Sequence, residues 1–167
     1  MRAAIPNADA LPPAIRDAFE SLLARINTVF QKEHTGDGAH MGWTTVAFDA
    51  AQYTGSGGMT WGVGAADVVT FKYLVLGNLM FVMGVWNTTS VTAPLGTTLK
   101  VKIPGGYVAA STMRDTNQAT DAGTVTSSQV RVDEDSTTID ILRQDGANWA
   151  AATNTTTVRV HTFFEVQ

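Results

Sequence analysis

The sequence contains no cysteine and few charged residues, and both shortages limit what the protein can be. Without cysteine there is neither a disulfide framework nor thiolate chemistry, which excludes a small secreted scaffold held together by disulfides. Charged residues make up 16% of the 167 positions, and the formal net charge is -4. The four lysines and seven arginines are scattered singly, so no basic stripe is available to follow a phosphate backbone. We therefore expect no binding to nucleic acid.

Long apolar runs are also lacking. The first residues, 1–13, include no apolar stretch of about 7–15 residues, so we expect no secretory signal. No segment reaches the roughly 20 apolar residues that cross a bilayer, so we expect no insertion into a membrane. The sequence predicts a soluble protein that is made in the cytoplasm.

What the chain has in quantity is threonine, with 24 residues spread along its length. Threonine is β-branched and suits half-buried strands, so the composition favours β structure. Residues 70–76 and 79–83 are strand-like runs on either side of Gly77-Asn78. Because glycine supplies the positive φ that a tight turn needs, this pattern predicts a β-hairpin.

Other runs with strand-like composition follow the same logic. They lie at 43–48, 59–63, 98–103, 107–111, 125–126 with 129–132, 138–142 and 157–166. The strand at 98–103 is expected to end at Pro104-Gly105-Gly106, and an acidic turn is expected at Asp133-Glu134-Asp135. About eight or nine strands with turns between most of them predict an antiparallel β-sandwich or jelly roll. The predicted fold class is mainly β, with one N-terminal α-helix.

The N-terminal pattern is helical. An apolar seam with the 4-3-4-3 spacing of a coiled coil consists of Ile15, Phe19, Leu22, Ile26 and Val29. Pro12 and Pro13 fit only at the start of a helix, so we expect it to run from about Pro13 to Lys32. A lone helix of roughly 20 residues is marginal in water, so the seam must be covered. The cover can be the rest of the same chain or other copies of it.

Two histidines and an aspartate lie close together after the helix, in the segment EHTGDGAH. His34, Asp37 and His40 have side chains that suit zinc or iron, and one histidine per chain around a threefold axis would give three nitrogen ligands. The simpler interpretation is that Gly36, Asp37 and Gly38 form the turn that ends the helix. A glycine-containing loop also holds ligands in poor geometry. The residues favour a hinge with no cofactor, and a metal site is the alternative.

The remaining candidate sites favour structural interpretations. Nucleophilic catalysis lacks a cysteine and a G-x-S-x-G motif, and His161 is the only histidine of the β region. The acidic run at 133–135 can bind calcium or serve glycosidic chemistry, but a solvated turn is simpler. The glycines at 55–58 are not followed by the lysine-bearing helix of a phosphate loop. Among the four tryptophans, Trp149 lies in a loop-like stretch and is the best candidate for an outside contact. We expect no enzyme activity.

The order of these motifs resembles a known family. A proline-bearing helix leads into EHTGDGAH and WTTV, and then come GSGGMTWG at 55–62, FKYLVLGNLMFV at 71–82 and LKVKIPGGY at 99–107. This arrangement is similar to the short trimeric structural proteins on tailed bacteriophage virions, namely tail fibres, head fibres and spikes. In these proteins a helical stem carries a β-jelly-roll knob. The resemblance implies a jelly roll, a homotrimer, and a structural and adhesive role.

The resemblance also implies a division of the chain. Residues 1–12 would be an extended arm that docks onto another virion protein, 13–34 a stem helix, 35–42 a hinge, and 43–167 the knob. The expected function is attachment to a glycan or protein of the host surface. The alternatives are a capsid decoration protein that stabilises the head, an envelope polysaccharide depolymerase, and a cellular sugar- or protein-binding module.

Overall fold

The computed structural model describes residues 15, 20–25 and 42–167. Among these, Ile15 and residues 20–25 are α-helical, and 43–167 form one compact unit, which we call the β unit. No helix in the described part of the chain is long and apolar enough to cross a membrane. The predicted helix bounds, the docking arm at 1–12 and nearly all of the hinge at 35–42 lie outside the described residues.

The β unit consists of strands joined by turns and short 3₁₀ helices. The strands are β1 (Thr44–Thr45), β2 (Tyr53–Gly55), β3 (Thr60–Gly62), β4 (Val68–Leu76), β5 (Leu79–Thr92), β6 (Thr98–Lys102), β7 (Met113–Asp121), β8 (Thr124–Val132), β9 (Thr138–Arg143) and β10 (Ala152–Glu165). The 3₁₀ helices are η2 (Ala50–Gln52), η3 (Ser56–Gly58), η4 (Ala65–Asp67) and η5 (Pro104–Gly106). The predicted class, mainly β with antiparallel strands, is confirmed, with ten described strands instead of eight or nine.

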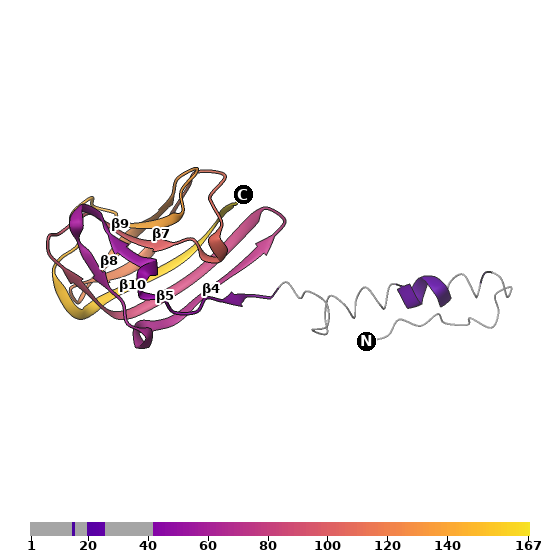
Figure 1. Ribbon diagram of the computed structural model, residues 1–167, viewed down its shortest axis with the longest axis horizontal. Helices are drawn as coiled ribbons and strands as arrows, with labels where there is room; N and C mark the ends of the chain where they lie inside the picture. Colours follow the sequence, from indigo (N-terminus) through magenta and orange to yellow (C-terminus); the bar gives the residue numbers. More distant parts are fainter. Residues whose placement is uncertain (1–14, 16–19, 26–41) are drawn as a thin grey trace. The chain divides into compact units, whose positions relative to one another are not determined.

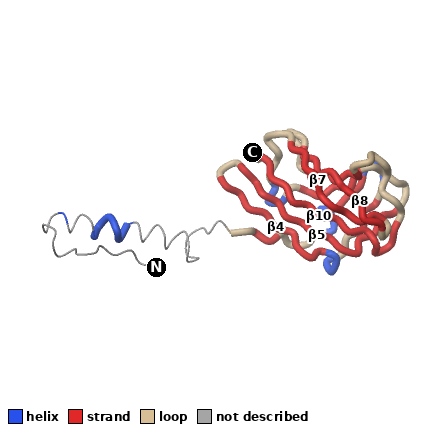
Figure 2. The backbone as a smooth tube through the Cα atoms, turned by 180° about the vertical axis from the view of Figure 1, so that it is seen from behind, coloured by secondary structure: helices blue, strands red, loops and turns tan. Residues whose placement is uncertain are grey.

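All ten strands belong to one antiparallel sheet that curls around a single core (Figures 1 and 2). The strand order is β1-β4-β5-β10-β7-β8-β9-β6-β2, and β3 pairs with β5 beside this path. Strand β10 pairs with β5 along most of its length, but it pairs with β7 only at Thr157 and Val158. Each strand therefore has an inward side that faces the core and an outward side.

An aromatic cluster lies at the centre of the core. The Trp86 ring is fully buried, and its centroid lies 5.2 Å from that of Phe71, 5.8 Å from Trp61 and 6.0 Å from Tyr53. The Trp86 indole Nε1–H donates a hydrogen bond of 3.1 Å to the Tyr53 hydroxyl. These rings come from β2, β3, β4 and β5, so the cluster joins strands that are distant in the sequence.

The predicted β4–β5 hairpin is confirmed, with Gly77 at φ 63° in the two-residue turn. The strand predicted at 98–103 and its end at Pro104 are also present as β6 and η5. The strand predicted at 107–111 is wrong. Its backbone divides its hydrogen bonds between two neighbours, because Ala109 N–H donates to Ser136 and Ala110 N–H donates to Glu165. Only an isolated bridge between Ala109 and Val166 forms there.

Two strands were not predicted from the sequence. Strand β7 reads MRDTNQATD, with Asp115 and Asn117 paired opposite Val130 and Ser128, so it lacks the apolar alternation that marks a strand. Strand β2 has only three residues and ends in glycine. The predicted strand at 43–48 is reduced to Thr44–Thr45 in β1.

Candidate functional site

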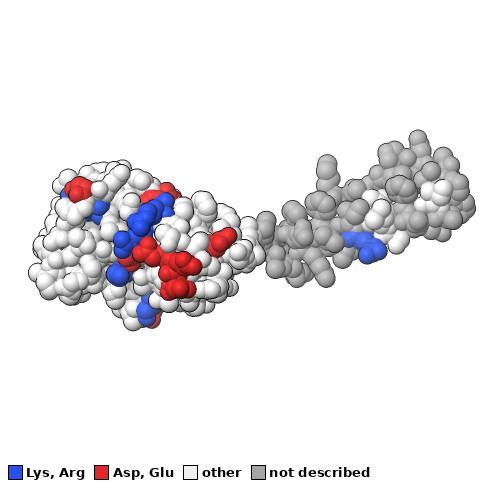
Figure 3. Space-filling view, turned by 90° about the horizontal axis from the view of Figure 1, so that it is seen from above, with Lys and Arg blue, Asp and Glu red and all other residues white. Residues whose placement is uncertain are grey.

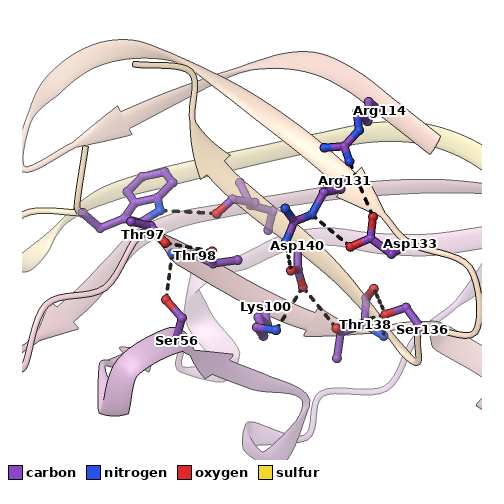
Figure 4. Close-up of polar contacts among 12 residues, drawn as sticks. Ser56, Thr97, Thr98, Lys100, Arg114, Arg131, Asp133, Ser136, Thr138 and Asp140 are labelled. Atoms are coloured by element: carbon purple, nitrogen blue, oxygen red, sulfur yellow. Dashed lines mark hydrogen bonds and ion pairs between the residues drawn. The ribbon is translucent and has the colours of Figure 1, made fainter. Parts of the chain in front are cut away.

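The outward side of β6, β9, β8 and β7 carries a row of paired charges (Figure 4). The Asp140 carboxylate lies 3.5 Å from Lys100 Nζ on one side and 3.0 Å from Arg131 Nη2 on the other. Asp133 continues the row, because its oxygens lie 3.2 Å from Arg131 Nε and 3.8 Å from Arg114 Nη2. Figure 3 shows cationic and anionic side chains next to one another on one side of the β unit. The charges of this row are thus compensated within the chain.

The contacts of Asp140 indicate that this row of charges stabilises the sheet. Its side chain is nearly buried, and a buried carboxylate is tolerated only when it is paired and hydrogen-bonded. Besides the two cations, it accepts a hydrogen bond of 3.1 Å from the Thr138 hydroxyl. The carboxylate oxygens are therefore committed to partners within the sheet.

A second ion-pair cluster lies where β7, β9 and the loop before β10 meet. Arg143 donates two hydrogen bonds to Asp145, of 3.1 Å from Nε and 2.6 Å from Nη2, and a third to the buried Asp121. The Ala150 N–H also donates to Asp121, at 3.1 Å. The bond from Arg143 lowers the pKa of the Asp145 carboxyl, and the same bond raises the pKa of Arg143. The Asp121 carboxylate, which lines the adjoining cleft of about 490 Å³, is therefore held by the Arg143 guanidinium.

The outward side of β4, β5 and β10 has the opposite character. Its residues, row by row across the three strands, are Leu76–Leu79–Glu165, Leu74–Phe81–Phe163, Lys72–Met83–His161 and Thr70–Val85–Arg159. We call its seven apolar residues, Leu74, Leu76, Leu79, Phe81, Met83, Val85 and Phe163, the apolar outward face. None of the seven is buried, and Phe163 is 48% exposed.

A strand that is apolar on both sides is typical of a strand covered on both sides. The inward residues of β5, such as Met80, Val82 and Trp86, are buried in the core. The alternate residues of the same strand, Phe81, Met83 and Val85, are also apolar but only half-buried. The apolar outward face therefore resembles a surface that lacks its cover.

A cleft of about 300 Å³ opens on this face. Its lining includes Trp43, Phe81, Met83, Asp115, His161 and Phe163. The Phe81 and Phe163 ring centroids lie 5.9 Å apart with the planes tilted by 33°. Trp43 is 41% exposed, and Lys72 Nζ lies 5.1 Å from the centroid of its ring. The cleft thus combines aromatic walls with one carboxylate and one imidazole, a composition typical of a binding surface.

Four charged residues surround the apolar outward face. Lys72, Arg159, Asp115 and Glu165 have no oppositely charged side chain within 4 Å among the described residues. Within the described part of the chain, Arg159 Nη1 donates only to the Gln118 amide, at 2.9 Å, and Asp115 accepts only from the Thr116 N–H, at 2.7 Å. This pattern contrasts with the paired row on the other side of the sheet.

The structure describes only part of the predicted seam and none of the predicted metal ligands. Ile15 and Leu22 are helical and about half exposed, whereas Phe19, Ile26 and Val29 lie outside the described residues. His34, Asp37 and His40 also lie outside them, so a metal site there stays a prediction. Within the described residues, no group of three or more histidine, aspartate or glutamate side chains is placed to hold a metal ion.

The prediction that Trp149 contacts something outside the chain is wrong. Its side chain is fully buried, and its indole Nε1–H donates a hydrogen bond of 3.3 Å to the Ile141 carbonyl. The Trp149 N–H donates to the Gly96 carbonyl at 3.0 Å, which fixes the loop over the core. Among the tryptophans, Trp43 is exposed and lines the cleft, and its position beside an apolar strand pair was not singled out from the sequence.

Comparison of the chain with protein-family models, with curated proteins and with solved structures found no match.

Proposed function

We propose that the chain is a structural protein on the surface of a bacteriophage virion, assembled as a homotrimer. In this proposal, residues 13–34 form a helical stem, the β unit forms a jelly-roll knob that attaches to a host-surface glycan or protein, and residues 1–12 dock onto another virion protein. The family resemblance of the sequence motifs supports the proposal. So does an antiparallel sheet curled around one core, because a jelly roll is one way in which such a sheet closes.

The observation that carries the trimer is the exposure of two apolar side chains in the helical residues. Ile15 and Leu22 are seven residues apart, so a heptad pattern places them on the same side of a helix. Their side chains are 49% and 52% exposed. Three helices around a common axis would cover both residues in every copy. Self-association would therefore account for the exposure of Ile15 and Leu22 in the single chain.

The seam is tested by placing a charge on it in the full-length chain. Leu22→Glu is expected to shift the trimer–monomer midpoint to a protein concentration at least about tenfold higher, because a buried charge in the seam costs more than about 1.4 kcal/mol. Ser21→Glu is the matched control, since Ser21 is exposed and its side chain points about 100° away around the helix. Sedimentation equilibrium measures both. Equal midpoints for the two variants would remove the stem from the assembly.

The virion assignment is tested by quantifying the chain in purified particles. A fibre or spike is expected in few copies, whereas a decoration protein would approach one trimer per local threefold axis of the capsid. Absence from the particles, together with a monomeric mass, would favour a cellular binding module. Release of reducing ends from host capsule by the pure protein would favour a depolymerase. Asp121, Asp140 and Asp145 are each paired with an arginine. Because these pairs occupy the carboxylates that glycoside hydrolysis would need, they support attachment rather than hydrolysis.

A further inference from the structure

We propose that the apolar outward face of β4, β5 and β10 is the contact between the β units of neighbouring copies of this chain. The inference rests on the proposed homotrimer, from which it takes the identity of the partner. It adds a second interface, built by the sheet, to the one proposed for the stem. Three observations lead to it: the apolar composition of the face, the contrast with the other side of the sheet, and the unpaired charges around it.

The composition requires a cover. Rows from three neighbouring strands place Leu74, Phe81 and Phe163 side by side, so their side chains form one continuous apolar surface. The adjoining row places Leu76 next to Leu79. Soluble proteins seldom leave such contiguous apolar patches in water, and large ones mark interaction surfaces. The burial of this surface would remove it from water without any change of the fold.

The outward side of β8 and β9, in the other half of the sheet, serves as an internal reference. On the outward side of β8, Ser127, Gln129 and Arg131 are polar, and one apolar residue, Val125, lies near the start of the strand. On the outward side of β9, Thr138 and Asp140 are polar and Leu142 is apolar. Those strands show the alternation of apolar and polar residues that is expected when one side faces water. Strands β4 and β5 depart from that alternation next to their turn, at 74–76 on β4 and at 79–85 on β5. The difference between the two outward sides indicates that only one of them is solvated in the assembled protein.

The charges indicate what provides the cover. Two cations, Lys72 and Arg159, and two anions, Asp115 and Glu165, surround the apolar outward face without an opposite partner among the described residues. Their formal charges sum to zero. Lys72 comes from β4 on one side of β5, and Asp115 comes from β7 on the far side of β10. Arg159 and Glu165 both lie on β10, in different rows of the face, so the two signs also alternate along the strand direction. A face that carries both signs in equal number is complementary to a second copy of itself.

A copy of this chain satisfies these requirements better than a partner of one sign. Around a closed ring each copy presents one edge of its face to the opposite edge of the next copy. Lys72 on β4 of one copy can therefore meet Asp115 on β7 of its neighbour. The aromatic cleft would then receive a side chain of the neighbouring copy, which fills it and excludes water from the ion pairs.

Single cysteines test the cover directly, because the natural chain has none. His161 and Ser127 are both exposed in the single chain, His161 on the face and Ser127 on the outward side of β8. In the full-length assembly, a fluorescent maleimide is expected to label His161→Cys at least about tenfold more slowly than Ser127→Cys. Phe163→Glu is expected to lower the mass measured by light scattering at a fixed concentration. Val125→Glu, on an exposed apolar residue of β8, is expected to leave it unchanged.

Each other outcome overturns the inference. Equal labelling rates would show that the face is free. If host polysaccharide then slowed the labelling at position 161 alone, the cleft would be a glycan site instead. Slow labelling in a monomeric chain would assign the cover to the N-terminal segment of the same molecule. Equal masses for Phe163→Glu and Val125→Glu would leave assembly to the stem. The particle count and the Leu22→Glu midpoint test the proposed function separately, since neither depends on the labelling of residue 161.

Discussion

Replacing Gly84 with alanine is expected to destabilise the β unit by about 3 kcal/mol, because the added methyl group would occupy space held by Trp86. A Cβ at position 84 would lie 2.1 Å from Cη2, 2.5 Å from Cζ3 and 2.9 Å from Cζ2 of the Trp86 ring. Carbon atoms in contact are separated by about 3.5–4.0 Å, so the indole would have to move by about 1.5 Å. Gly84 is thus required by the position of its neighbour two residues along the strand.

The magnitude follows from what holds the indole in place. Phe71, Trp61 and Tyr53 surround it at centroid distances of 5.2–6.0 Å, so a shift disturbs three packed rings. Overpacking of this kind costs up to about 3 kcal/mol. Loss of the hydrogen bond from Trp86 Nε1–H to Tyr53 adds about 1 kcal/mol. The removal of a flexible glycine from a strand offsets about 0.5–1 kcal/mol, which leaves about 3 kcal/mol.

Urea unfolding monitored by tryptophan fluorescence, at one protein concentration for all variants, measures the change as a lower midpoint at constant slope. Gly77→Ala is the control, because Gly77 has φ 63° and a Cβ there would meet no atom within 4 Å. Its expected cost is only about 1 kcal/mol, from backbone conformation alone. Adding Trp86→Phe to Gly84→Ala should recover part of the loss. Additivity of the two changes within about 0.5 kcal/mol would refute the steric argument.

Three further variants concern ionisable groups. Asp121→Asn should lower the free energy of unfolding by about 3 kcal/mol in urea, because the buried carboxylate holds Arg143. The hydrogen bond from Arg143 lowers the pKa of Asp145, so the stability that the Asp145 carboxylate contributes is present above pH 3.8. It disappears as the pH falls through the lower pKa of Asp145 in the folded protein. Asp145→Asn should therefore lose less stability than the natural chain when the unfolding free energy is measured at decreasing pH. Tyr53→Phe should cost about 1–2 kcal/mol, because a buried indole N–H loses its acceptor. Burial raises the pKa of Tyr53 above 10.0, so the stability that its neutral hydroxyl contributes is fully present below pH 10.0. This contribution is lost as the pH rises through the pKa of Tyr53 in the folded protein. Thermal unfolding in alkaline buffers should show that Tyr53→Phe lacks this decline.

Many strands of the sheet could be predicted from local sequence patterns. The β4–β5 hairpin depends on a glycine with positive φ between two apolar runs, and both signals are local. Strand β7 escaped prediction because its alternate positions are Asp115 and Asn117, not apolar residues. Those side chains lie where β7 separates from β10, and the Asn117 amide there accepts a hydrogen bond from the His161 N–H at 3.0 Å. A polar strand of this kind is defined by its neighbours, which local periodicity does not reveal.

The misplacement of Trp149 has a related cause. Its surroundings, Ala147, Asn148 and Ala150, have the composition of an exposed loop, and the residue does lie outside the strands. The loop is nonetheless folded over the core by a hydrogen bond to Gly96, which is remote in the sequence, and by another to Ile141 on β9. Burial of an aromatic residue in a loop is therefore a tertiary property. Exposure in Trp43 is tertiary in the same sense, because it depends on the position of Trp43 beside β4.

The apolar outward face shows what the sequence pattern does contain. Consecutive apolar residues at 73–76 and 79–83 are typical of strands that are buried on both sides. In β4 and β5 the described residues cover only the inward side. We therefore infer that the second side of these strands is covered when the protein assembles. A sheet edge or loop would suffice for a single exposed leucine, but rows aligned across three strands require a partner with a matching broad surface. Around the rows, two cations and two anions lack an oppositely charged partner among the described residues. This balance is the reason for which we propose a second copy of the chain, which carries the same two signs, as the partner.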